Sequence, residues 1–380
     1  QPSLVAGSDR FGTYVGGGAA LYFSDLLGNR NLVTGLQVNG GFEDITALVG
    51  YQNVGSRFNW GVTAQQVPYL TGRYASGTAE VNGEPAFVEQ QQLERQTNRT
   101  LSGIVAYPFS TVQRVEVSAG AAHISFDREL RTRGFSLLTG QQLIDEEEDL
   151  EAGESLTLGF GSAALVYDNS FFGATGPILG QRYRLEFAQT VGDWSFSQVT
   201  ADYRRYDRII GPIVFATRLL YFGRIGRDAR EFRIYAGSTD LIRGNTSGSY
   251  RRNECLNADD PGSETGCAEL DRLVGTQIGV ASAELRFPIL NPSFGVPAAF
   301  PPLEGALFYD LGMAWDNTST IRWNRRAGDD PVRVRTPLRT FGVSVRANLF
   351  GFAVARLDYS IPQQRPAVGG LWTFSLGPTF

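Results

Sequence analysis

The sequence predicts an all-β protein, a transmembrane antiparallel β-barrel of about 16 strands. Its composition is typical of strands and turns, with 45 Gly, 25 Phe and 15 Tyr among 380 residues. Short segments of alternating apolar and polar residues recur along almost the whole chain. No stretch approaches the ~18 to 20 consecutive apolar residues of a membrane helix. Closed barrels reach this length as one domain, so we expect residues 1–380 to form a single barrel domain.

The expected strands follow one another as alternating segments. Residues 304–315, for example, place Leu307 and Tyr309 on one face and Asp310 on the other, and Glu284 lies on the polar face of a similar segment. The even total agrees with bacterial barrels. In chain order, the expected strands are 1–8, 16–24, 30–39, 45–53, 58–67, 97–107, 112–126, 155–168, 180–191, 196–207, 213–223, 275–288, 303–315, 336–349, 352–362 and 370–380.

A soluble β-sandwich also alternates, but its polar face points to water and is rich in Lys and Glu. This chain has no Lys, so all 34 basic residues are Arg, and its polar faces mix Arg with acidic, hydroxylic and small residues. Lipid satisfies no backbone polar group, so a spanning sheet must close on itself. We therefore expect apolar faces toward lipid and polar faces toward a lumen.

The connections between these strands alternate in length. Bacterial barrels have short periplasmic turns and long outer loops, which places the acidic run 145–154 outside the cell. We expect a solvated loop there, and a site for Ca²⁺ or for a lipopolysaccharide-bound ion is the alternative, because carboxylates suit hard cations. The short connections are 25–30, 53–57 and 107–111, and the long ones are 68–96, 127–154 and 224–274.

The longest connection contains the sequence FRIYAGSTDLIRGNTSGSY, residues 232–250. It resembles the sixth outer loop of the BamA/TamA-like outer-membrane assembly superfamily, also called the bacterial surface antigen family. That loop carries an aromatic residue, Gly-Gly, and then a hydrophobic residue, Arg, Gly and an aromatic residue. Asn245 stands where the family has its second aromatic residue. The matching residues are Ala236, Gly237, Ile242, Arg243 and Gly244.

The resemblance extends over residues 167–380, and residues 11–67 are similar to barrels fused behind TolB-type propellers. It implies that the sixth outer loop folds into the lumen and that Arg243, followed by Gly244, pairs there with Glu284 and Asp310. The planar guanidinium suits this role because it can bond carboxylates bidentately. The alternative places Arg243 in a solvated loop.

Cys255 and Cys267 lie in the same loop. An outer loop is exposed to an oxidising compartment, so we expect a disulfide between them, and two free thiols are the alternative. The bridge would order the loop tip and stabilise the fold by about 3 kcal/mol.

The last segment, 370–380, ends on an aromatic face that fits a lipid-facing strand closing the barrel. The terminal pattern is similar to the C-terminal signal of outer-membrane barrels. Its residues are Trp372, Phe374, Leu376 and Phe380.

The resemblance implies an outer-membrane protein that inserts other barrels or translocates polypeptides. Its partners would be lipid, lipopolysaccharide, a periplasmic domain or accessory proteins, and a client β-barrel or exported polypeptide. A passive pore or an anchor for a periplasmic partner is the alternative. The net charge of −5 gives no reason to expect nucleic acid.

We expect no enzyme and no cofactor, because no phosphate loop, metal cluster or cofactor fingerprint is present. The chain has one histidine, His123, which shares a strand face with Ser125 and Asp127. Their spacing only follows strand alternation, so a polar cluster is expected, with a nucleophile-and-base pair as the alternative.

Overall fold

A computed structural model gives the structure of the chain, which divides into two compact units. Residues 1–107, 116–162 and 190–194 form the first unit, and residues 108–115, 163–189 and 195–380 form the second. The structure describes residues 2–9, 12–39, 44–251, 254, 267–290, 302–326, 328–330, 333–349, 351, 353–365 and 368–377.

The predicted all-β fold is confirmed. In the described part of the chain, one antiparallel sheet contains 18 strands, of which β8 and β10 are additions to the sixteen segments expected from the sequence. Two small two-stranded sheets accompany it. Within the described residues, no helix is long and apolar enough to span a membrane.

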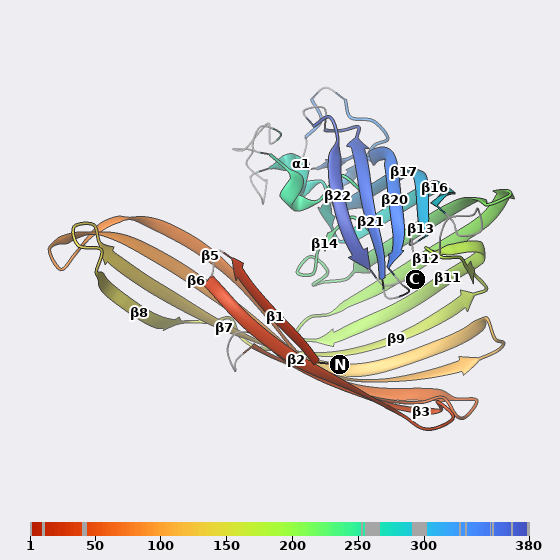
Figure 1. Cartoon of the computed structure of the whole chain (residues 1–380), viewed down its shortest axis with the longest axis horizontal. Helices are drawn as coiled ribbons and strands as arrows, with labels where there is room; N and C mark the ends of the chain where they lie inside the picture. Colours follow the sequence, from red (N-terminus) through yellow and green to blue (C-terminus); the bar gives the residue numbers. More distant parts are fainter. Residues whose placement is uncertain are drawn as a thin grey trace. The chain divides into compact units, whose positions relative to one another are not determined.

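The strands from β1 to β9 are neighbours in the antiparallel ladder, mostly as consecutive hairpins (Figure 1). Their bounds are β1 (Pro2–Asp9), β2 (Gly12–Ser24), β3 (Arg30–Asn39), β4 (Ile45–Asn53), β5 (Asn59–Val81), β6 (Glu84–Pro108), β7 (Gln113–Ser136), β8 (Gln142–Leu150) and β9 (Leu156–Asp168).

The predicted outer loop 68–96 is wrong, because most of it belongs to β5 and β6. These strands stay paired up to Val81 and Glu84. Asn82 and Gly83 join them with φ angles of 52° and 82°. Two consecutive positive φ angles at Asn-Gly are typical of a tight type I′ hairpin turn.

The predicted loop 127–154 is wrong for a related reason. Its first part continues β7, and the acidic run lies mainly on β8, opposite β7. Arg131 and Arg133 approach Glu147 and Asp145 to 3.6 Å across the pair. Such cross-strand ion pairs stabilise a strand with no apolar face. Among the described residues, no group of three His, Cys, Asp or Glu side chains could hold a metal ion.

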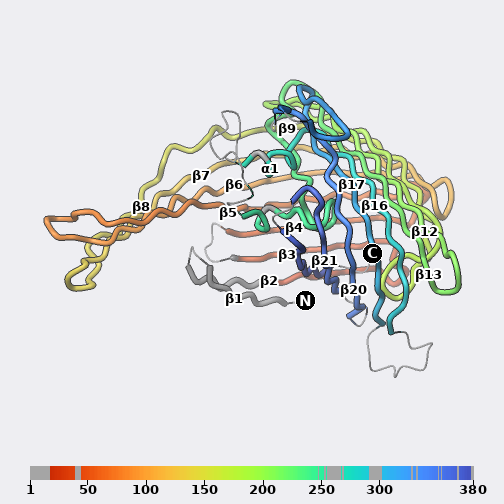
Figure 2. The backbone as a smooth tube through the Cα atoms, turned by 90° about the horizontal axis from the view of Figure 1, so that it is seen from above, coloured from red at the N-terminus to blue at the C-terminus, as the bar shows by residue number. Residues whose placement is uncertain are grey.

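The strands of the second unit also follow chain order, and Figure 2 shows β12, β13, β16, β17, β20 and β21 side by side. The bounds are β10 (Phe171–Phe172), β11 (Pro177–Gly192), β12 (Phe196–Ile210), β13 (Ile213–Ile225), β14 (Ile234–Tyr235), η2 (Ser247–Ser249), α1 (Ala268–Asp271), β15 (Val274–Gly275), β16 (Gln277–Leu290), β17 (Leu303–Trp315), β18 (Thr320–Ile321), β19 (Val334–Arg335), β20 (Leu338–Leu349), β21 (Ala353–Pro362) and β22 (Leu371–Gly377).

The two faces of these strands differ in burial as the alternation predicts. On β17, Leu307 and Tyr309 are 50% and 43% exposed, whereas Phe308 and Asp310 are 4% and 1% exposed. We call the face that carries Asp310 the inner face. The opposite face presents apolar side chains without a covering layer, as a lipid-facing surface does.

The last strand, β22, continues this pattern, since Trp372, Phe374 and Leu376 are all exposed. Phe380 lies outside the described residues. Within the described residues, β22 pairs only with β21. Closure of the sheet between its first and last strands therefore stays a prediction.

Candidate functional site

The loop between β13 and β16 is tied at its base by a short antiparallel pair. Ile234 of β14 lies opposite Gly275 of β15. Above this pair the loop buries an apolar core in which Ile242 and Leu273 are fully buried. Gly312 of β17 makes room for this core, because a Cβ atom there would lie 2.4 Å from Ile242 Cδ1. The loop therefore packs directly on the inner face of the sheet.

Two glycines of the loop motif are required by its backbone. Gly244 has a φ of 77°, and a Cβ atom on it would lie 3.0 Å from Ser360 Cβ. A Cβ atom on Gly237 would lie 2.1 Å from the carbonyl oxygen of Asn245. Only glycine allows this fold of the chain without a shift. The sharp turn that results points Arg243 toward the inner face.

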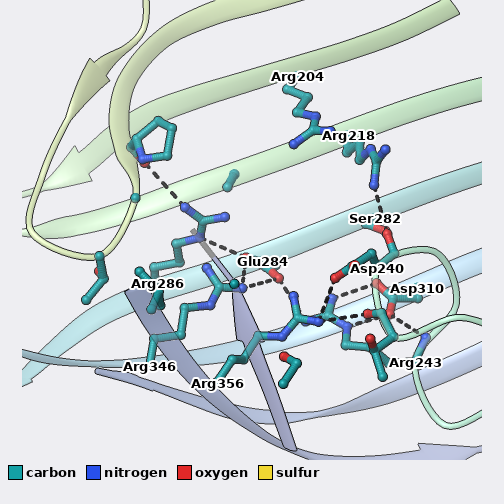
Figure 3. Close-up of a pocket in the computed structure, with 18 of the residues that line it drawn as sticks. Arg204, Arg218, Asp240, Arg243, Ser282, Glu284, Arg286, Asp310, Arg346 and Arg356 are labelled. Atoms are coloured by element: carbon teal, nitrogen blue, oxygen red, sulfur yellow. Dashed lines mark hydrogen bonds and ion pairs between the residues drawn. The ribbon is translucent and has the colours of Figure 1, made fainter. Parts of the chain in front are cut away.

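Arg243 is the centre of the candidate site (Figure 3). Its Nε and Nη2 atoms donate to the two carboxylate oxygens of Asp310 at 2.7 Å each, which is a bidentate pair. Its Nη1 atom donates to Glu284 Oε1 at 2.8 Å. All three residues are less than 10% exposed. The structure thus brings together Arg243, Glu284 and Asp310, which the sequence resemblance pairs.

An aromatic ring supports the same guanidinium. The Cζ atom of Arg243 lies 3.5 Å from the centroid of the Phe308 ring. Gly342 on the neighbouring strand leaves space for that ring, because a Cβ atom there would lie 2.7 Å from Phe308 Cζ. A cation over an aromatic face gains roughly 2 kcal/mol when it is desolvated. Phe308 has the same strand parity as Asp310, so alternation predicts that it faces inward, but alternation does not predict this stacking role.

Glu284 binds two further arginines from the inner face. Arg286 Nε donates to Glu284 Oε2 at 2.7 Å, and Arg346 Nη2 donates to both carboxylate oxygens at 2.7 and 2.9 Å. One carboxylate therefore compensates three guanidinium groups. A buried carboxylate is stable only with such compensation.

Asn245, which departs from the family motif, is 1% exposed, and both ends of its side-chain amide form hydrogen bonds. Its Nδ2 atom donates to the Arg243 carbonyl at 3.1 Å and to Thr340 Oγ1 at 3.2 Å. Its Oδ1 atom accepts from the Tyr250 hydroxyl at 3.2 Å. Burial raises the pKa of Tyr250 to about 12, so the hydroxyl keeps its proton at neutral pH. A polar network therefore fills the place of the family's aromatic residue.

The network continues across the inner face around a cavity of about 440 Å³. Arg356 Nη2 donates to Asp240 Oδ1 at 2.9 Å, and Arg218 Nη1 donates to the Asp240 carbonyl at 2.8 Å. Among the described residues, ion pairs here join six arginines to six carboxylates, so the formal charges of these twelve groups cancel. These residues are Arg204, Arg218, Arg243, Arg286, Arg346, Arg356, Asp202, Asp240, Glu284, Glu304, Asp310 and Asp358.

Within the part of the chain that the structure describes, His123 and Ser125 contact residues outside the Arg243 network. Cys267 is buried and disulfide-bonded, whereas Cys255 lies outside the described residues. His123 Nδ1 lies 3.2 Å from Thr157 Oγ1. Ser125 Oγ accepts from Arg99 Nη1 at 3.2 Å. These hydrogen bonds are those of a polar cluster.

Comparisons with known proteins agree with this architecture. The crystal structure of BamA from Haemophilus ducreyi lacking POTRA domains 1–3 is similar, with a TM-score of 0.59 and 14% identity over 99% of this chain and 69% of that chain. CdiB from Escherichia coli is similar with a TM-score of 0.52 and 12% identity over 100% of this chain and 62% of that chain. At these identities the likeness shows the fold. No curated protein matches the chain.

The family model of the Omp85 superfamily domain matches residues 31–380. The resemblance found in the loop motif is thereby confirmed at the level of the superfamily, while the likeness to propeller-fused barrels stays a prediction. Because the match covers most of the sequence, the chain belongs to the Omp85 superfamily of outer-membrane β-barrel proteins.

Proposed function

We propose that residues 1–380 form one outer-membrane barrel that inserts or translocates polypeptide clients, and that the loop carrying Arg243 holds its lumen closed at rest. The observation that carries the proposal is the bidentate Arg243–Asp310 pair, extended to Glu284. It fixes a long loop to β16 and β17 by one side chain. A loop held in this way is suited to obstructing a lumen until it is released.

The energetics favour a lock with two distinct states. Removing one partner of a buried ion pair costs about 3–5 kcal/mol, because the remaining charge loses its compensation. Partial displacement of the Arg243 side chain is therefore unfavourable, whereas complete withdrawal into water hydrates both partners. Packed interfaces of this kind switch between discrete arrangements.

Single-channel recording in planar bilayers tests the proposal. The purified barrel is compared with Arg243→Ala, Arg243→Lys and the control Arg333→Ala, because the side chain of Arg333 is 81% exposed in another loop. We expect small or flickering currents from the unmodified barrel and from Arg333→Ala. We expect large currents from Arg243→Ala, and intermediate currents from Arg243→Lys, because an ammonium group cannot bond both oxygens as a planar fork does.

The other outcomes discriminate the alternatives. Large steady currents from the unmodified barrel would overturn the closed lumen and favour a passive pore. The absence of current from every variant would overturn the proposed gate and favour an anchor with a filled lumen. Reconstitution of the barrel with unfolded outer-membrane proteins in liposomes then tests the client class, through protease protection of the inserted or translocated chain.

A further inference from the structure

Arg365 lies in the connection between the last two strands, β21 and β22, and is 3% exposed. It comes three residues after Pro362, where β21 ends, and six before Leu371, where β22 begins. No alternation marks this segment, and the proposed gate does not explain why a guanidinium should be buried there. A buried arginine needs compensating partners.

Each of the five N–H donors of an arginine finds an acceptor here. Nε and Nη2 donate to the two oxygens of Glu254 at 2.8 and 3.0 Å. Nη1 donates to the Gly244 carbonyl at 2.7 Å and to Ser249 Oγ at 2.9 Å, and Nη2 also donates to the Ser249 carbonyl at 2.7 Å. All these acceptors belong to the loop that carries Arg243.

The ring of Tyr250 completes the enclosure, since the Cζ atom of Arg365 lies 3.8 Å from its centroid. The Glu254 side chain is 4% exposed, so the pair is shielded from water on both sides. Oε1 of Glu254 also accepts from the backbone N–H of Arg251 at 2.9 Å. The contact is therefore a second buried ion pair on the same loop, as fully satisfied as the first.

The two arginines hold adjacent parts of the loop to different strands. Arg243 binds Asp310 on β17 and Glu284 on β16, and the carbonyl of the next residue, Gly244, is bound by Arg365 beside β22. Movement of Arg243 out of its pocket must displace that carbonyl as well. Within the described residues, β22 has no strand partner except β21, so this clamp adds to the restraint on its outer end.

We infer that Arg365 is a positioning residue that couples release of the Arg243 loop to loosening of the terminal strand β22. The inference rests on the proposed gate and extends it. With the clamp closed, the loop and the terminal strand leave their resting positions together. With the clamp broken, each moves independently of the other.

Hydrogen–deuterium exchange of the whole barrel tests this coupling, read by mass spectrometry over β22 and over residues 232–251. The variants are Arg243→Ala, Arg365→Gln, their combination, and Glu254→Gln, which opens the clamp from the loop side. We expect Arg243→Ala to raise exchange in β22 by about tenfold where Arg365 is present, because exchange reports local opening. In the Arg365→Gln background, the same change should leave β22 exchange unaltered.

Arg322→Gln is the matched control, because the Arg322–Asp329 pair at 2.8 Å lies in another outer loop. It should change neither segment, and Arg365→Lys should give an intermediate result because it retains one charge but fewer donors. Equal effects of Arg243→Ala on β22 in both backgrounds would overturn the coupling. Unchanged hydrogen–deuterium exchange over residues 232–251 in both Arg365→Gln and Glu254→Gln would also overturn it. Hydrogen–deuterium exchange is measured independently of channel current. If exchange shows the coupling but no variant conducts in bilayers, the proposed gate is rejected and the coupling stands.

Discussion

Glu284 and Asp310 both bind Arg243, but their surroundings differ. Asp310 forms a bidentate pair with Arg243, whereas Glu284 also receives Arg286 and Arg346. We expect Glu284→Gln to destabilise the barrel more than Asp310→Asn, because it leaves three buried guanidinium groups undercompensated, with losses on the order of 3–5 kcal/mol. Urea unfolding followed by tryptophan fluorescence measures this. The reverse order would show that Arg286 and Arg346 find other partners.

Glu254 gives the clamp a pH dependence. Burial alone would raise the pKa of Glu254, but hydrogen bonds from Arg365 and from the Arg251 backbone outweigh it and lower that pKa. A carboxylate with a lowered pKa stabilises the fold above its ordinary value, about 4.3 for Glu, and this contribution is lost as the pH falls through the lowered value. The clamp is therefore closed at neutral pH.

We expect acidification from pH 7 through the lowered pKa of Glu254 to protonate it and to increase loop opening, recorded as a rising fraction of large single-channel currents. Glu254→Gln should already show the increased fraction of large currents at pH 7 and should lack this acid step. An acid step of the same size in Glu254→Gln would assign it to other carboxylates.

Alternation placed Glu284 and Asp310 on the inner face from the sequence alone, since a strand has a period of two. The same reasoning could not find Arg365, which lies in an aperiodic connection and whose partners are distant in sequence. The role of Asn245 was also hidden. Two of its hydrogen-bond partners, Arg243 and Tyr250, lie in the same loop, but the third, Thr340, lies on β20 and is brought close only by folding.

At the level of elements, β5 and β6 are far longer than a membrane requires. They contain 23 and 25 residues, whereas a tilted transmembrane strand needs about 9–11. The excess forms a hairpin that continues beyond the membrane-spanning part. Apolar alternation predicts only the lipid-facing part of a strand, which explains why the sequence suggested a loop there.

We therefore expect truncation of this hairpin to spare the barrel. Residues 73–92 are removed at the Arg73–Gln92 pair and replaced by an Asn-Gly turn, which suits a two-residue hairpin. The shortened protein should show unchanged heat-modifiable migration in gel electrophoresis and unchanged currents. Failure to assemble would show that the hairpin stabilises the barrel or guides its folding. Truncation at the same pair with a flexible Gly-Ser linker controls for the turn.

At the level of the whole molecule, the balanced charges of the ion-pair network predict weak ion selectivity. Six arginines and six carboxylates form the ion-pair network, and Arg243→Ala leaves five arginines and six carboxylates. We expect opened Arg243→Ala channels to show a reversal potential close to zero in a KCl gradient, with a slight preference for cations. Strong selectivity of either sign would place the conducting path elsewhere. Arg333→Ala is again the control.

The absence of Lys determines how the charge of the inner-face ion-pair network changes with pH. A guanidinium keeps its charge at every pH that a cell surface meets. Of the paired groups on the inner face, only the acids can change charge, and they change it in one direction. Acid protonates carboxylates and makes the neutral ion-pair network positive, whereas base removes no proton from its guanidinium groups. The charge of this network therefore responds to pH in one direction only. Added protons can make the lumen attract anions, but removal of protons does not make it attract cations.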